Sequence, residues 1–109
     1  MRVLIACVGL LASAAFAKDA PAPATSADGK ALYHEKCAMC HDKTGMGTGL
    51  LARRSTTPEL LQRIDLDAAF VVQAARAGIG NMPAIPRGEV SDRQLQAIAE
   101  YLAQPEKRR

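Results

Sequence analysis

The sequence has few aromatic residues from which a small domain could build its core. Its 109 residues include no Trp, two Phe and two Tyr, and Phe16 lies in the apolar segment near the start. Chains below about 70–80 residues rarely stabilise themselves by one core alone, and the chain that follows the apolar start, residues 18–109, is only just longer. The shortage of aromatic side chains therefore predicts a bound apolar group at the centre of the fold.

The sequence also has only a small excess of positive charge and no long apolar run. The 14 Lys and Arg against 11 Asp and Glu give a formal net charge of +3, which is no reason to expect nucleic acid as a partner. The apolar run near the start covers residues 3–16, short of the ~20 residues that a membrane-spanning helix needs. Alternation of polar and apolar residues, the pattern of a β-strand, is absent, so we expect an all-α fold.

The first residues match a secretory signal peptide over 1–17. A positively charged start precedes the apolar run, and residues 15–17 (Ala-Phe-Ala) have the small-x-small pattern of a cleavage site. The alternative is that this segment stays uncleaved as a membrane anchor. A lipoprotein signal is excluded, because Cys7 lies too close to the start of the chain. Cleavage would place the chain in the periplasm, with no stable membrane insertion, and leave Cys37 and Cys40 as its cysteines.

One domain is expected after this segment. Residues 18–27 are rich in Ala, Pro, Thr and Ser and carry too little apolar surface to fold, which predicts a flexible leader. The domain is expected over residues 28–104, followed by a charged tail over 105–109.

About four short helices are expected in the domain, two of them in its first half. Asp28 is the predicted cap of a helix that runs into residues 37–41, and the glycine-rich segment 40–49 is expected to be a loop. Thr57 followed by Pro58 predicts the start of a second helix. Its expected apolar face consists of Leu60, Leu61 and Ile64.

The second half carries two clearer helical patterns. Residues 68–77 have apolar side chains at a helical period, and Gly78 should end that helix. The segment 78–86 contains Gly and Pro and is expected to be a loop. Ser91 and Gln94 form a capping box for the last helix. The expected buried face of that helix consists of Leu95, Ile98, Ala99 and Leu102.

The motif that carries the most chemical information is Cys-Ala-Met-Cys-His at residues 37–41. C-x-x-C-H is the pattern of covalent c-type haem attachment, in which two thiols one turn apart add to the two vinyl groups of a haem. The adjoining histidine can then ligate the iron. C-x-x-C alone also occurs in zinc sites and thioredoxin-like proteins, but no strand–helix pattern surrounds this one. We predict one haem c attached through Cys37 and Cys40, with His41 as an iron ligand.

Met82 is the predicted second iron ligand. It lies in a glycine-rich loop far along the chain from His41, and Pro83 forces an extended backbone at Met82. A thioether is a common axial partner of a haem histidine and raises the reduction potential. Met39 and Met46 lie in or near the attachment turn, on the histidine side, and His34 is expected to face solvent. Packing of Met82 in the core without ligation remains the alternative.

With these residues the chain resembles the small class I cytochromes c of the bacterial periplasm. The resemblance covers residues 28–103 and rests on three segments. These are the motif at 37–41 preceded by Gly29 and Tyr33, the loop Gly-Ile-Gly-Asn-Met-Pro at 78–83, and Ile-Ala-Glu-Tyr-Leu at 98–102. The resemblance implies that the first and last helices cross at Gly29, with Tyr33, Ile98 and Tyr101 around the crossing.

The chain departs from that family near the iron-ligating histidine. Many members have a proline soon after the motif, and its carbonyl accepts a hydrogen bond from the histidine. This chain has no proline between His41 and Pro58. We therefore expect another carbonyl, within residues 45–49, to orient His41.

These features predict a one-electron carrier that is not itself an enzyme. With His41 and Met82 both on the iron, no position is open for oxygen or peroxide, and no catalytic base, nucleophile or substrate pocket is evident. The expected partners are a dehydrogenase, a bc1-type complex or an oxidase, and a monomer is expected. Two alternatives stay open: a dedicated cytochrome subunit of a periplasmic dehydrogenase, and a haem sensor whose Met82 detaches. Arg53 and Arg54 could bind haem propionates or partners, although solvated charge is the commoner role.

Overall fold

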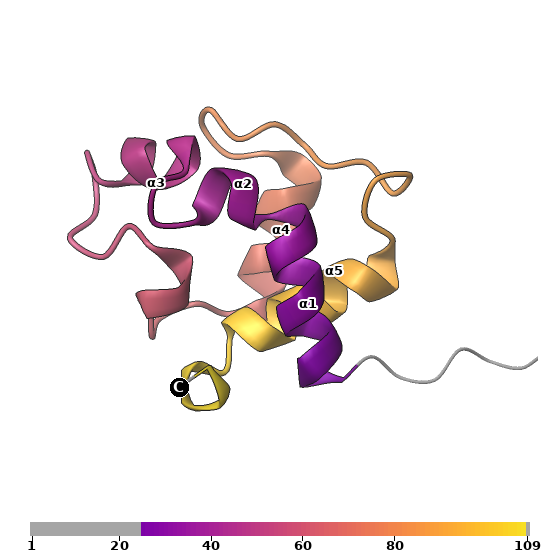
Figure 1. The fold of residues 1–109 in the computed structure, drawn as a ribbon. Coiled ribbons are helices and arrows are strands. Elements are labelled where there is room, and N and C mark those ends of the chain that lie inside the picture. The colour runs from indigo at the N-terminus through magenta and orange to yellow at the C-terminus, as the bar shows by residue number, and fades with distance from the viewer. Residues whose placement is uncertain (1–24, 109) are drawn as a thin grey trace, which may run out of the picture.

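The computed structural model describes residues 25–108, which form five α-helices and two single 3₁₀ turns (Figure 1). No strand occurs within this range, so the expectation of an all-α fold is confirmed. The elements are α1 Ser26–Lys36, α2 Ala38–His41, α3 Met46–Leu51, η1 Leu60–Gln62, α4 Ala68–Ala77, α5 Asp92–Leu102 and η2 Pro105–Lys107. The predicted signal peptide and most of the predicted leader lie outside the described residues.

Helix α1 begins slightly earlier than its expected start at Asp28. Thr25 is the cap: its side chain accepts from the Asp28 N–H at 3.2 Å, and the Asp28 carboxylate accepts from the Thr25 N–H at 2.8 Å. This reciprocal arrangement is a capping box. Asp28 therefore stabilises the start of the helix from inside its first turn, and the prediction of Asp28 as the cap was wrong.

The close crossing of α1 over α5 is the main packing contact of the domain (Figure 1). A Cβ atom on Gly29 would meet the carbonyl oxygen of Ala97 and lie 2.8 Å from the Tyr101 Cβ. Tyr33 and Ile98 are each 1 % exposed beside this crossing, and the Tyr33 and Tyr101 ring centroids are 6.1 Å apart. The crossing implied by the family resemblance is confirmed.

Helix α3, Met46–Leu51, begins inside the segment 40–49 that was expected to be a loop. Two glycines in a six-residue helix oppose helix formation in isolation. Tertiary packing accounts for Gly47, because a Cβ there would lie 2.7 Å from the Cys40 carbonyl oxygen. The segment is helical because it packs closely on α2. Helix propensities of single residues do not include such a tertiary contact.

The helix predicted from Thr57 is absent, and a single 3₁₀ turn over Leu60–Gln62 takes its place. The Arg108 guanidinium donates to the carbonyl oxygens of Leu60 and Arg63, which a continuing helix would use internally. Ile64, expected on the buried face, is 76 % exposed. The fold thus prefers an irregular segment tied to the C-terminal residues over an isolated short helix, which is marginal by itself.

Helices α4 and α5 agree with their sequence patterns. Helix α4 spans the expected residues, is capped by the Asp67 side chain, and ends at Gly78 with φ 77°. Ser91 and Gln94 form the capping box of α5. The predicted apolar face of α5 is buried, and so are two further residues of that helix, Ala97 and Tyr101. No helix within residues 25–108 has both the length and the apolar character needed to cross a membrane.

Replacing Gly29 with Ala should lower the free energy of unfolding by about 1–3 kcal/mol, because the added methyl group forces α1 away from α5. Denaturant unfolding of the purified protein measures the change. Gly49→Ala is the matched control, since Gly49 lies in α3 and a Cβ there meets no atom within 4 Å. This control should be neutral or stabilising by up to ~1 kcal/mol. Equal stability of the two variants would contradict the packing argument.

Candidate cofactor site

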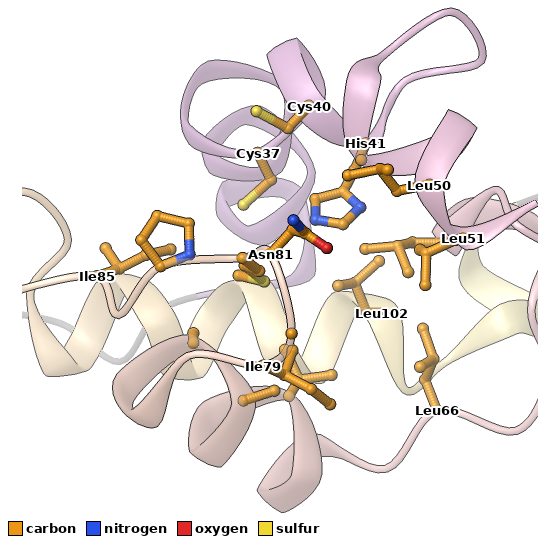
Figure 2. A pocket seen from close by; sticks show the side chains of 18 of the residues that line it. Cys37, Cys40, His41, Leu50, Leu51, Leu66, Ile79, Asn81, Ile85 and Leu102 are labelled. Atoms are coloured by element: carbon orange, nitrogen blue, oxygen red, sulfur yellow. The ribbon is translucent and has the colours of Figure 1, made fainter. Parts of the chain in front are cut away.

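A largely apolar cavity of about 450 Å³ lies between the 37–41 motif and the second half of the domain (Figure 2). Its walls come from α2, α3, residues 60–66, α4 with the loop after it, and α5. The apolar side chains that line it include Leu50, Leu51, Leu66, Ile79, Ile85 and Leu102. The volume is within the range of about 300–1,000 Å³ that is usual for sites of small molecules and cofactors.

The two cysteines of the motif lie on one turn at the edge of this cavity. Cys37 ends α1 and starts α2, and its carbonyl oxygen accepts from the N–H groups of Cys40 and His41 at 3.1 and 2.9 Å. Both thiols are free and line the cavity, Cys37 half-buried and Cys40 exposed. Burial, assisted by the neighbouring Cys40, raises the pKa of Cys37 to about 11. The Cys37 thiol is therefore held in its neutral form.

The His41 side chain points into the cavity beside these thiols (Figure 2). The Tyr33 hydroxyl donates to the His41 carbonyl oxygen at 3.1 Å, so the buried tyrosine holds the backbone of the motif. Burial lowers the pKa of His41, which favours the neutral imidazole. A neutral imidazole is the form that ligates a metal.

No carbonyl within residues 45–49 accepts from the His41 ring, and that expectation was wrong. The Nδ1 atom of His41 is buried and has no hydrogen-bond partner among the described residues. The ring instead packs against the backbone at Gly47, where a Cβ would lie 3.3 Å from His41 Cε1. Steric contact with α3 replaces the hydrogen bond that a proline carbonyl would supply.

Met82 belongs to a tight turn on the α4 side of the cavity. Ile79 and Met82 exchange two backbone hydrogen bonds, at 3.0 and 2.9 Å, and Gly78 and Gly80 have φ of 77° and 55°. These positive φ values favour glycine, and a Cβ on Gly78 would also lie 2.9 Å from the Met82 carbonyl oxygen. The turn presents Met82, half-buried, to the cavity. Asn81 projects into the same space (Figure 2).

The predicted site residues line one cavity, and most of the alternative ligand candidates lie outside it. Cys37, Cys40, His41 and Met82 all line it. Met46 lines it too, but this side chain is 72 % exposed and comes from α3, next to His41. Met39, 89 % exposed, and His34, exposed on α1, are not part of the lining.

Three arginines contribute cationic groups to the lining, Arg53, Arg54 and Arg63. The Arg63 guanidinium donates to both carboxylate oxygens of Asp65, at 2.8 and 2.7 Å, so its charge is offset. Arg53 and Arg54 follow α3 and are exposed. Arg53 and Arg54 were candidates from the sequence, whereas Arg63 and Asn81 were not. For Asn81 the available signal was its place next to Met82.

The donor set does not suit a protein-held zinc ion. Structural zinc sites use four Cys or His ligands, with the cysteines as thiolates. Within residues 25–108 no group of three or more His, Cys, Asp or Glu side chains is placed to hold a metal ion. The residues do suit a large planar apolar group that carries its own metal. They offer two thiols at one edge, a neutral imidazole, a thioether, apolar walls and nearby arginines for anionic substituents.

Comparison with known proteins gives two matches. The model of the family described as "Cytochrome C oxidase, cbb3-type, subunit III" matches residues 24–102. A curated relative, the "4-cresol dehydrogenase [hydroxylating] cytochrome c subunit" of Pseudomonas putida, is 34 % identical over 95 residues. The aligned region covers 87 % of this chain and 73 % of the relative.

Proposed function

This chain belongs to the c-type cytochromes, in the family matched over residues 24–102, and on that premise we propose how it holds its haem. It carries a covalently bound haem c and acts as an electron carrier, in which the haem iron gains and releases one electron. We propose that Cys37 and Cys40 attach the haem and that His41 and Met82 ligate the iron. The observation that carries the assignment is that all four side chains line one apolar cavity.

The attachment turn supports the roles of Cys37 and Cys40. Their backbone hydrogen bonding keeps the two sulfur atoms one turn apart at the cavity edge, and no disulfide joins them. The neutral Cys37 thiol is half-buried, while Cys40 is exposed. Two thioether bonds at one edge would fix the orientation of the haem relative to His41.

The two proposed iron ligands are far apart in the sequence: His41 belongs to α2, and Met82 belongs to the loop after α4. His41 is neutral and held from behind by Tyr33 and Gly47, and Met82 is presented by a turn that Gly78 and Gly80 make possible. Ligands held in this way need little rearrangement when the charge of the iron changes, which suits electron transfer. With His41 and Met82 both bound to the iron, no position would be open for a substrate, which favours a carrier over a catalyst.

Haem attachment through both cysteines has a direct chemical test. Denaturation in acid followed by extraction with organic solvent should leave the haem on the protein, because thioether bonds survive both steps. Cys37→Ala and Cys40→Ala should each lower the yield of haem-containing protein sharply, since attachment and folding are coupled in so small a domain. Haem that leaves with the solvent would contradict covalent attachment.

Ligation by Met82 should be visible in the absorption spectrum. Met82→Ala should abolish the weak red sulfur-to-iron charge-transfer band, lower the reduction potential, and allow carbon monoxide to bind the reduced protein rapidly. Met46→Ala is the matched control, because Met46 also lines the cavity but should leave all three properties unchanged. A reversed pattern, with the band lost in Met46→Ala alone, would assign the ligand to Met46.

We propose that the protein works in the periplasm and passes electrons through brief encounters with a dehydrogenase and a respiratory acceptor. We propose that these encounters use an apolar rim of Ala38, Ile79 and Ala84. Ile79 is 53 % exposed and Ala84 is exposed, while Ala38 is half-buried. Exposed Met39 and Met46 extend the apolar surface near the Cys40 edge. A dedicated dehydrogenase subunit is the second candidate, favoured by the name of the P. putida relative.

Electron exchange with a purified periplasmic dehydrogenase separates these two candidates. A transient carrier should elute alone in gel filtration and exchange electrons in stopped-flow experiments with only a modest dependence on salt. The reason is that the encounter relies on a small apolar rim and not on a large field of one sign. A complex that survives gel filtration would instead establish a dedicated subunit. A steep fall of rate with salt, relieved in Arg53→Gln or Arg54→Gln, would mean that charge governs docking.

A further inference from the structure

Arg76, in the last turn of α4, binds the backbone of the segment that follows Met82. Its Nη1 donates to the Ile85 carbonyl oxygen at 2.9 Å, and its Nη2 donates to the Val90 carbonyl oxygen at 2.8 Å. Nη2 also donates to Asp92 Oδ1 at 2.9 Å. The side chain is 16 % exposed. Hydrogen bonds to a charged group at a partly buried site are stronger than neutral ones, so this guanidinium is a firm anchor.

The anchor acts on the part of the chain that positions Met82. Ile85 lies three residues after Met82, and its N–H donates to the Ala75 carbonyl oxygen at 2.8 Å. Both peptide groups of Ile85 are thus held by neighbouring residues, Ala75 and Arg76, at the end of α4. On the other side of Met82 the chain is held by bonds between neutral backbone groups, from the Gly78 N–H to the Ala74 carbonyl oxygen at 2.8 Å and between Ile79 and Met82. The charge-assisted attachment of this segment is on the Ile85 side.

We propose that Arg76 is the positioning residue for the second iron ligand: it holds the segment after Met82 against α4 and so keeps the methionine sulfur on the iron. This inference rests on the proposed ligation by Met82. Asp92 completes the arrangement, since Arg87 and Arg76 both hydrogen-bond to its carboxylate and keep its pKa below the usual range. The cationic Arg76 therefore has an ionised partner at neutral pH.

Arg87 provides a matched control within the same ion-pair cluster. Its Nε donates to Asp92 Oδ2 at 2.8 Å, but its side chain is 71 % exposed. Within residues 25–108, the Arg87 side chain bonds to Asp92 and not to the loop backbone. Arg87→Gln and Arg76→Gln remove the same charge near the same carboxylate. Only the second removes the bonds to Ile85 and Val90.

The test is the binding of imidazole to the oxidised haem-containing protein in a stopped-flow instrument. At saturating imidazole the observed rate equals the rate at which Met82 leaves the iron. Arg76→Gln should raise this limiting rate by about tenfold or more, because charge-assisted bonds to two carbonyls are lost. Arg87→Gln should stay within about twofold of the unmodified protein, as for a surface ion pair. Arg76→Lys should fall between them, since an ammonium does not reproduce the guanidinium fork.

Far-UV circular dichroism during denaturant unfolding measures the overall stability of each variant. A raised limiting rate in a variant of unchanged stability reflects release of the segment after Met82 and not general destabilisation. If Arg76→Gln yields no folded protein, the limiting rate is measured on Arg76→Lys instead. A limiting rate that is unchanged in the folded Arg76 variants, or raised equally in Arg87→Gln, would overturn the proposal. Met82→Ala tests the premise separately, because that variant should bind imidazole without a limiting step. If it kept the limiting rate of the unmodified protein, Met82 would not be the ligand, and the role of Arg76 would fall with it.

Discussion

The close contact of α1 with α5 at Gly29 is the constraint from which the geometry of the site follows. Because Gly29 has no side chain, α1 lies directly on the backbone of Ala97, and Tyr33 is buried at the same contact. The Tyr33 hydroxyl then binds the carbonyl of His41, which sets the attachment turn relative to the crossing. Helix α5 also supplies Leu95, Ile98 and Leu102 to the cavity lining. One packing contact thus places both the motif and the apolar floor of the haem site.

The other half of the site depends on the end of α4. Gly78 ends that helix and starts the turn that carries Met82, while Arg76 and Ala75 hold the chain beyond it. In a domain with so few aromatic side chains, a haem bound between the two halves would supply the apolar centre that the sequence lacks. The same group would join His41 and Met82 across the cavity, so that stability and redox function rest on one cofactor.

The sequence predicted the features that depend on local chemistry. The C-x-x-C-H motif, the capping box at Ser91 and the glycine and proline of the Met82 loop are short patterns whose causes lie within a few residues. Two of the failures have their cause in tertiary contacts. Gly47 of α3 permits close contact with Cys40. In the segment where a helix was expected after Thr57, the carbonyls of Leu60 and Arg63 accept from Arg108, 45 or more residues away. In the sequence, Arg76 is an ordinary charged residue near the end of a helix. Only the folded structure shows that it bonds to two carbonyl groups.

The central claim is that the haem lies between His41 and Met82, and proton NMR of the reduced protein tests it most directly. A methyl group fixed over the face of a haem experiences the ring current and resonates far upfield of ordinary methionine methyls. With the methionine methyls labelled, the account predicts one strongly upfield methyl, assigned to Met82 by its loss in Met82→Leu. The methyls of Met39 and Met46 should keep the shifts of exposed side chains. An upfield signal that belongs to Met46, or none at all, would contradict the account.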